Sequence, residues 1–336
     1  MSATELMVSP PAISAPVRGA ASAFDYLALL KPRVMSLVVF TALTGLICAG
    51  AHMDPWLAAV AVLCISVGAG GAAALNMAYD GDIDALMRRT RRRPVPSGRV
   101  QASDARALGL TLSLFSVTLM GLTANWLAAG LLAFTIAFYV LVYTRWLKRR
   151  TPQNIVVGGL AGALPPLVGW AAASGTAPLN AWLLVAIIFV WTPPHFWALS
   201  LYTSEDYAAA GVPMMPLVRG VASTRRQILA YCLVLAPLGV VPAFTGLAGP
   251  FYGLTATIGG VVLVVLAIIL TTRSAEATVA GPAAGRETLY HVNPGARPAR
   301  NLFAFSLVYL FALFAALLVE KLAGVAPLVT GAILNR

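Results

Sequence analysis

Long runs of apolar residues, separated by short polar segments, constrain this chain more than any other feature. Nine such runs lie near residues 34–50, 55–79, 107–124, 126–143, 154–174, 180–200, 227–246, 250–271 and 301–322. A helix that crosses a bilayer needs about 17 to 25 mostly apolar residues. Only 10% of the residues are charged and mean hydropathy is +0.83, which excludes an ordinary soluble domain. Because no alternating strand pattern is present, the sequence predicts an all-α integral membrane protein, a bundle of nine transmembrane helices.

Lysine and arginine are concentrated in alternate loops of this predicted bundle. Of the chain's 23 basic residues, 21 fall in segments near 18–33, 88–106, 145–150, 219–226 and 273–300. The intervening loops "AHMDPW", "TANW", "SGTAPLN" and "TGLAGP" contain none. Basic loops stay in the cytoplasm, so the pattern supports nine crossings with the N-terminus inside and the C-terminus outside. It also accounts for the net charge of +11, so nucleic acid is not an expected partner.

The sequence indicates one membrane domain over residues 25–322. We expect a flexible cytoplasmic segment at 1–24, with no signal-peptide core, and a short tail at 323–336. A bacterial inner membrane is the expected location. The three cysteines lie inside apolar runs: Cys48, Cys64 and Cys232. Without paired spacing, they indicate core packing rather than disulfides or metal ligands.

The densest charge follows the second apolar run, in "LNMAYDGDIDALMRRTRRRPVPSG" at residues 75–98. Asn76, Asp80 and Asp84 are four residues apart, so a continuing helix would place them in one polar stripe. Carboxylates one turn apart repel each other, and burial adds to the need for a cation. Mg²⁺ commonly takes one or two protein carboxylates and completes its shell with water and phosphate oxygens. The stripe therefore predicts a magnesium diphosphate site, whereas Asp82, which is out of phase, is expected to be solvated or paired with arginine.

Arginines follow the stripe in "RTRRRP". Arg89 and Arg93 are again four apart, and guanidinium groups bind phosphate oxygens through planar pairs of donors. An arginine cluster after a membrane span is also an ordinary topology signal. That alternative stays open for the cluster as a whole and is favoured for Arg88, Arg91 and Arg92.

Two further loops on the same side carry candidate residues. "YTRWLKRRTPQN" offers Tyr143 and Lys148, and the lysine suits either a phosphate or membrane anchoring. "WTPPHFWALSLYTSEDYAAAGVPMMP" offers His195, Glu205 and Asp206. A neutral imidazole among aromatic side chains inside the membrane is able to ligate iron or act as a base, although a buried histidine is often only hydrogen-bonded.

Four segments together resemble a known family: "NMAYDGDID", "RTRRRPVPSG", "YTRWLKRRTPQNIVVGGLAGALPPLVGW" and "PPHFWALSLYTSEDYAAAGVPMMP". They resemble the protohaem IX farnesyltransferases, also called haem O synthases, within the UbiA-type intramembrane prenyltransferases. The resemblance runs from about residue 25 to 320. The third segment and the "PHFW" sequence are specific to the haem branch, whereas the stripe alone indicates only the superfamily.

The resemblance implies a nine-helix bundle with a central cavity open to the cytoplasmic side and the lipid. It also implies a reaction in which haem B, farnesyl diphosphate and water give haem O and diphosphate with Mg²⁺ as cofactor. Haem O is the precursor of haem A, so candidate protein partners are haem A synthase and terminal oxidase assembly factors.

The resemblance implies a role for each candidate residue. Catalysis would involve Asp80, Asp84, Arg89, Arg93 and Lys148, metal binding Asn76, Asp80 and Asp84, and substrate binding Asn76, Tyr143, His195, Glu205 and Asp206. His195 would contact the haem. The wider superfamily has a second DxxxD motif where Glu205 and Asp206 stand, but Ala210 occupies its last position, which departs from a two-metal pattern.

Two alternative functions remain. A prenyltransferase acting on a quinone precursor or a chlorophyll-type ring would share the stripe, but the "PHFW" segment disfavours it. A transporter would line a pathway with its intramembrane charges and often repeat its halves. The odd helix count and the one-sided polar cluster disfavour a transporter.

Overall fold

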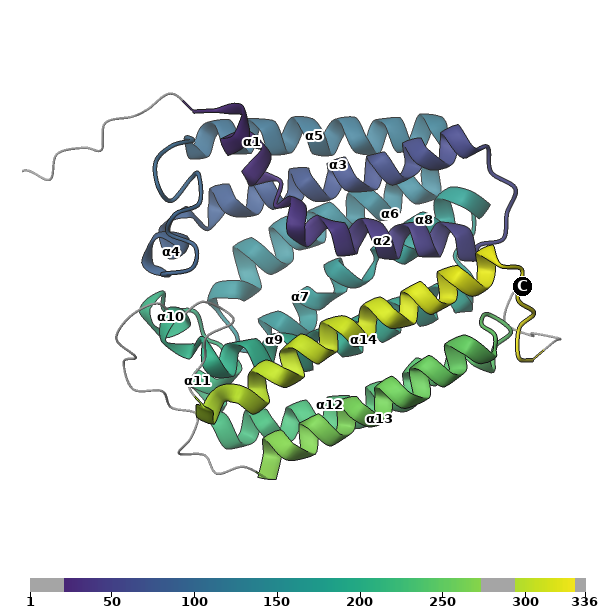
Figure 1. Ribbon diagram of the computed structural model, residues 1–336. Coiled ribbons are helices and arrows are strands. Elements are labelled where there is room, and N and C mark those ends of the chain that lie inside the picture. The colour runs from purple at the N-terminus through teal and green to yellow at the C-terminus, as the bar shows by residue number, and fades with distance from the viewer. Residues whose placement is uncertain (1–20, 273–293, 330–336) are drawn as a thin grey trace, which may run out of the picture.

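The computed structural model describes residues 21–272 and 294–329, and within them all regular structure is helical (Figure 1). This confirms the all-α prediction. In these two ranges eight helical segments are long and apolar enough to cross a membrane. They are α3 (Pro55–Tyr79), α5 (Ala102–Thr123), α6 (Trp126–Ala137) continued by η1 (Phe138–Trp146) and η2 (Leu147–Arg149), α7 (Asn154–Ala163) continued by α8 (Pro165–Ser174), α9 (Leu179–Tyr202), α12 (Val221–Val240) continued by η3 (Val241–Ala243), α13 (Pro250–Thr272) and α14 (Arg297–Leu322).

The first predicted span is a broken helix. It consists of α1 (Ala23–Leu29) and α2 (Pro32–Cys48), which meet at an angle of 50°, and counting this pair as one span gives nine. Lys31, at the break, has left-handed backbone angles of φ 51° and ψ 58°. That conformation costs a non-glycine residue about 1–2 kcal/mol. The proline at the first position of α2 is suited to starting a helix there.

Several helices begin before the apolar run that predicted them. The structure starts α5 at Ala102 and α12 at Val221, whereas the apolar runs begin near 107 and 227. The difference arises because the first two turns carry polar residues, including Asp104 and Arg226. Turns that project beyond the lipid need not be apolar.

Contacts between neighbouring long helices close into a ring, and α9 also packs across it against α14. Neighbours in contact follow the order α2, α3, α5, α6, η1, α7, α9, α12, α13 and α14, and α14 closes the ring against α2. α8 lies against α2, α3, α6 and α9. Its packing on α2 is very close, because a Cβ added at Gly45 would come within 2.0 Å of the Pro166 carbonyl oxygen, and one added at Gly169 within 2.0 Å of the Ala42 carbonyl oxygen. Small residues at such positions let membrane helices approach at backbone distance.

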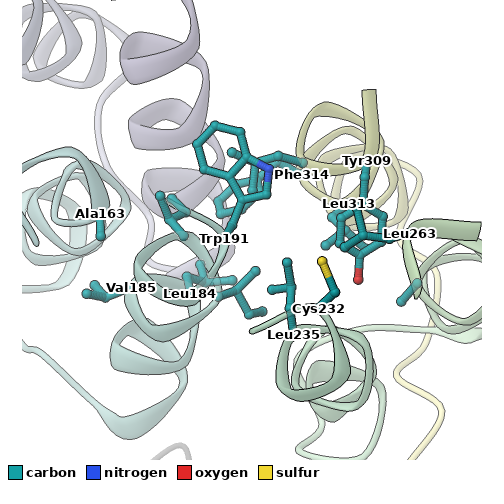
Figure 2. Close-up of a cluster of buried hydrophobic side chains, with 14 of the residues drawn as sticks. Ala163, Leu184, Val185, Trp191, Cys232, Leu235, Leu263, Tyr309, Leu313 and Phe314 are labelled. Atoms are coloured by element: carbon teal, nitrogen blue, oxygen red, sulfur yellow. The ribbon is translucent and has the colours of Figure 1, made fainter. Parts of the chain in front are cut away.

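Most of the buried apolar side chains belong to two large clusters. One lies between α9, α12, α13 and α14, where Leu184, Cys232 and Tyr309 converge (Figure 2). The other lies between α2, α3, α5, α6 and α8. Each of the three cysteines is buried and free, which confirms that they pack in the core.

The two ends of the bundle differ in character. The short helices α4 (Gly81–Leu86), α10 (Ser204–Ala209) and α11 (Met215–Arg219) all lie at the end where α3 and α9 finish, called here the basic end (Figure 1). The described chain begins at this end and finishes at the other. Exposed tryptophans stand at the start of α3, α6 and α9, at the opposite end: Trp56, Trp126 and Trp182. Tryptophan favours the boundary between lipid and water, so these residues mark one face of the membrane.

Candidate active site

The predicted polar stripe lies at the basic end, where α3 passes into α4. Asp80 interrupts the helix with φ −94° and ψ 6°. The path nevertheless stays helical, because the Asp80 N–H donates to the Asn76 carbonyl at 2.9 Å and the Asp84 N–H to the Asp80 carbonyl at 2.8 Å. The three side chains therefore share one face and are 4%, 1% and 2% exposed in chain order.

A cation binds each carboxylate of the stripe. Lys148 Nζ of η2 donates to Asp80 Oδ2 at 2.5 Å, and an Arg93 guanidinium nitrogen donates to Asp84 Oδ2 at 2.6 Å. Charged partners stabilise carboxylates that burial would otherwise disfavour. The structure thus brings together four of the residues singled out in the sequence, from two segments that lie far apart in the chain.

The second oxygen of Asp80 suits a metal ion. Asp80 Oδ1 is buried without a hydrogen-bond partner, and an Arg149 nitrogen lies 3.9 Å away. A buried anionic oxygen without a partner is unfavourable, and a hard divalent cation would satisfy it. The described residues contain no group of three His, Cys, Asp or Glu side chains placed to hold a metal, at the stripe or away from it. Asp80 and Asp84 therefore fit Mg²⁺, which needs only one or two carboxylates when phosphate oxygens complete its shell.

Asn76 takes part in a network that the sequence analysis missed. Its Oδ1 accepts a hydrogen bond from Lys31 Nζ at 2.7 Å. Its Nδ2 donates to Asp80 Oδ2 at 2.7 Å and to Thr144 Oγ1 at 3.0 Å. Lys31 could have been found from the sequence, because a lysine directly before a proline at the start of an apolar run is unusual. Nothing in the sequence pointed to Thr144.

A π-helix carries Tyr143 and leads directly into η2, the short helix that carries Lys148. The segment η1 is a π-helix, a form that is rare and frequent at functional sites. Tyr143 stacks on Tyr139 with ring centroids 5.4 Å apart. It also packs against α7, where a Cβ added at Gly158 would lie 2.2 Å from the Tyr143 ring. The glycine therefore lets α7 approach η1 and support the segment that carries Lys148.

The second acidic pair lies apart from the stripe and binds Arg88. One Arg88 nitrogen lies 3.0 Å from Glu205 and another 3.1 Å from Asp206. Arg88 thus joins the loop after α4 to α10, a contact that a topology signal alone does not predict. The geometry gives the second acidic pair a role in holding the two loops together, and shows no contact of this pair with Asp80 or Asp84.

Asp82 and Arg89 both have partners at the basic end. Arg149 donates to both oxygens of Asp82 at 2.6 Å, which agrees with an arginine-paired role and lowers the pKa of that carboxyl. Arg89 is exposed and lies beside Tyr207. Burial raises the pKa of Tyr207, so its hydroxyl keeps its proton at neutral pH. Neither Tyr207 nor Arg149 was predicted from the sequence.

His195 lies in the interface between α9 and α14. Its ring is sandwiched between Trp191 and Phe303, with centroid distances of 4.3 and 4.5 Å. Its Nδ1 lies 2.7 Å from Ser306 Oγ, and that hydroxyl donates to the Phe303 carbonyl. A neutral ring protonated on Nδ1 would donate to this hydroxyl and leave the lone pair on Nε2. The described contacts of His195 thus come from α9 and α14 rather than from the stripe.

The fold and the stripe together define the class as the intramembrane prenyltransferases. The sequence profile of the UbiA prenyltransferase family matches residues 38–281. The chain therefore belongs to this family and is a prenyltransferase enzyme.

Relatives with high identity carry one name. A protein named "Protoheme IX farnesyltransferase" from Caulobacter vibrioides is 59% identical, over 96% of this chain and 99% of that protein. A protein of the same name from Brucella anthropi is 55% identical, over 90% of this chain and 92% of that protein. Within the UbiA family, the chain is thus a member of the group that carries this name.

Solved structures share the fold at low sequence identity. A digeranylgeranylglyceryl phosphate synthase structure superimposes with a TM-score of 0.70 at 15% identity, over 89% of this chain and 98% of that one. A UbiA homologue from Archaeoglobus fulgidus, described as bound to GPP and Mg²⁺, gives 0.58 at 15% identity, over 87% and 99%. These likenesses show the fold alone.

Proposed function

We propose that this enzyme joins the farnesyl group of farnesyl diphosphate to a vinyl group of haem B, with addition of water, to give haem O and diphosphate. The names of the Caulobacter and Brucella relatives support the haem substrate. The observation that carries the proposal is the burial of Asp80 and Asp84 at the basic end, each against a cation, with one Asp80 oxygen still without a hydrogen bond.

The residues of the stripe would act on the diphosphate. Asp80 and Asp84 would hold Mg²⁺, which when bound neutralises charge on the diphosphate as it leaves. Arg93 and Lys148 now bind these carboxylates, and both carry further N–H donors for phosphate oxygens. Arg89, which lies beside Tyr207, would add a further guanidinium group at the basic end.

The reaction balances as follows. The bond between the allylic carbon and the diphosphate oxygen breaks, and the diphosphate takes the electron pair. The π electrons of the haem vinyl group form the new carbon–carbon bond, which leaves a cation on the carbon next to the porphyrin. Water adds to that carbon and loses a proton. Departure of the diphosphate leaves an allylic cation, which the stacked faces of Tyr139 and Tyr143 would stabilise. The surrounding helices would exclude water until the vinyl group has reacted.

His195 is the proposed haem contact. The tautomer protonated on Nδ1 would donate to Ser306 and offer the Nε2 lone pair that an iron ligand requires. Glu205 and Asp206 would bind substrate only indirectly, by holding α10 through Arg88.

The proposal extends to the setting of the enzyme. The bundle would cross a bacterial inner membrane nine times around a central cavity open to the basic end, which would face the cytoplasm. Haem A synthase and terminal oxidase assembly factors remain the candidate partners for its product.

A product assay tests the proposal. Purified protein with haem B, farnesyl diphosphate and Mg²⁺ should yield haem O, identified by mass and absorption spectrum, and chelation of Mg²⁺ should stop it. Formation of a prenylated quinone precursor but no haem O would overturn the choice of acceptor. Solute transport in vesicles that persists in Asp80→Ala, without release of diphosphate, would overturn the enzyme assignment of this site.

A further inference from the structure

The amide of Asn76 has a single allowed orientation in its network. A protonated Lys31 has only donors, so its Nζ meets the amide oxygen, at 2.7 Å. An ionised Asp80 has only acceptors, so it must meet the amide nitrogen, also at 2.7 Å. Turning the amide over would place nitrogen against nitrogen and oxygen against oxygen. Lys31 therefore determines that Asn76 donates to Asp80.

The backbone at Lys31 is held in an unfavourable conformation to make this contact. Among the described residues, Lys31 is the only non-glycine residue with positive φ. It also precedes a proline, which directs the preceding residue toward extended angles. Unfavourable backbone angles of this kind concentrate at functional sites. The break between α1 and α2 thus presents the Lys31 side chain to the stripe.

We propose that Lys31 is a positioning residue that acts through Asn76. By occupying Oδ1, it makes Asn76 a hydrogen-bond donor that orients Asp80, rather than a ligand of the metal. This inference rests on the proposed function, because it assigns the metal to Asp80 and Asp84 and removes Asn76 from the ligand set expected for it.

A double-mutant cycle between Lys31 and Asn76 tests the proposal. Lys31→Met should lower kcat by about 10- to 100-fold, the loss expected for a hydrogen bond with a charged group, with little change in KM for farnesyl diphosphate. In an Asn76→Ala background the same substitution should have almost no further effect, since residues that act through one another are not additive. Additive losses, or a raised KM with unchanged kcat, would show that Lys31 binds the diphosphate directly and would overturn the proposal.

Binding of Mn²⁺, followed by electron paramagnetic resonance with inorganic diphosphate present, gives a readout that does not need turnover. Lys31→Met should weaken Mn²⁺ binding in the wild-type background and leave it unchanged in Asn76→Ala. If wild-type protein makes no haem O but this pattern holds, the proposed function fails and the positioning role stands. If wild-type protein is active and Lys31→Met binds Mn²⁺ normally, the positioning role fails alone.

Two controls separate this role from folding. Lys31→Gly removes the ammonium but accepts positive φ without strain, so it should be at least as thermally stable as Lys31→Met and equally impaired. Arg33→Met removes an exposed cation two residues away and should behave as wild type. Recovery of activity in Lys31→Gly would assign the whole effect to the backbone and contradict the proposal.

Discussion

At the scale of single residues, the site depends on charges that are buried and matched. Asp80 receives Lys148 and the Asn76 amide on one oxygen, while its other oxygen has no hydrogen bond. Asp82, two residues on, is exposed and paired with Arg149. Two aspartates of one short segment therefore differ in environment, so we expect them to have different roles.

Asp80→Asn should lower haem O formation by at least about 100-fold, as loss of a group that stabilises developing charge commonly does. Asp82→Asn should keep most of the activity, because exposed ion pairs contribute about 1 kcal/mol or less. The rates are measured with haem B and farnesyl diphosphate, and thermal unfolding in detergent checks that both variants fold. Similar losses in the two variants would contradict the assignment.

His195→Phe tests the haem contact. A phenyl ring preserves the stacking between Trp191 and Phe303 but removes the Nε2 lone pair. We expect KM for haem B to rise at least about tenfold, a free-energy loss of about 1.4 kcal/mol, while KM for farnesyl diphosphate stays unchanged. A variant with lower thermal stability but normal kinetics for haem B would show that His195 serves only the core.

At the scale of elements, short local departures from the regular α-helix shape the site. The break at Lys31, the interruption at Asp80 and the π-helix η1 all contribute side chains to one network. The sequence predicted the stripe because a spacing of four is a property of any helix. It did not predict the π-helix, because the apolar pattern of 126–143 suits an α-helix equally well.

Gly158 and Gly162 of α7 form a matched pair for testing the packing of η1. A Cβ at Gly158 would overlap the Tyr143 ring, whereas one at Gly162 would meet nothing within 4 Å. Gly158→Ala should therefore destabilise the protein by about 1–3 kcal/mol and lower turnover by displacing Tyr143. Gly162→Ala should leave stability and turnover close to wild type. Thermal unfolding and product assays measure both, and equal behaviour of the two variants would contradict the close contact.

At the scale of the whole molecule, charge gives the bundle two distinct ends. The basic end carries the stripe and its ion pairs, whereas exposed tryptophans occur at both ends: Trp56, Trp126 and Trp182 at one and Trp146 at the basic end. We therefore expect the basic end to face the cytoplasm.

Labelling of introduced cysteines tests this orientation. Ser103 at the basic end and Thr176 at the other are both exposed, and the native cysteines are buried. In intact spheroplasts, a membrane-impermeant maleimide should label Thr176→Cys and leave Ser103→Cys unlabelled until the membrane is broken. The reverse pattern would invert the topology.

The sequence by itself determined the helical membrane fold, the position of most spans and the polar stripe. These features follow from composition and from spacing within one helix, because lipid requires apolar side chains and internal backbone hydrogen bonds wherever a chain crosses it. Arg93 was also within reach of sequence reasoning, since it lies only nine residues from Asp84.

Only the tertiary structure decided which partners meet the stripe. Lys31 and Lys148 lie 45 and 68 residues from the groups that they bind, and His195 meets Ser306 across 111 residues. Such pairs depend on which helices become neighbours and on how closely glycines let them approach. Those outcomes arise from packing of the whole ring, so no local pattern of residues contains them.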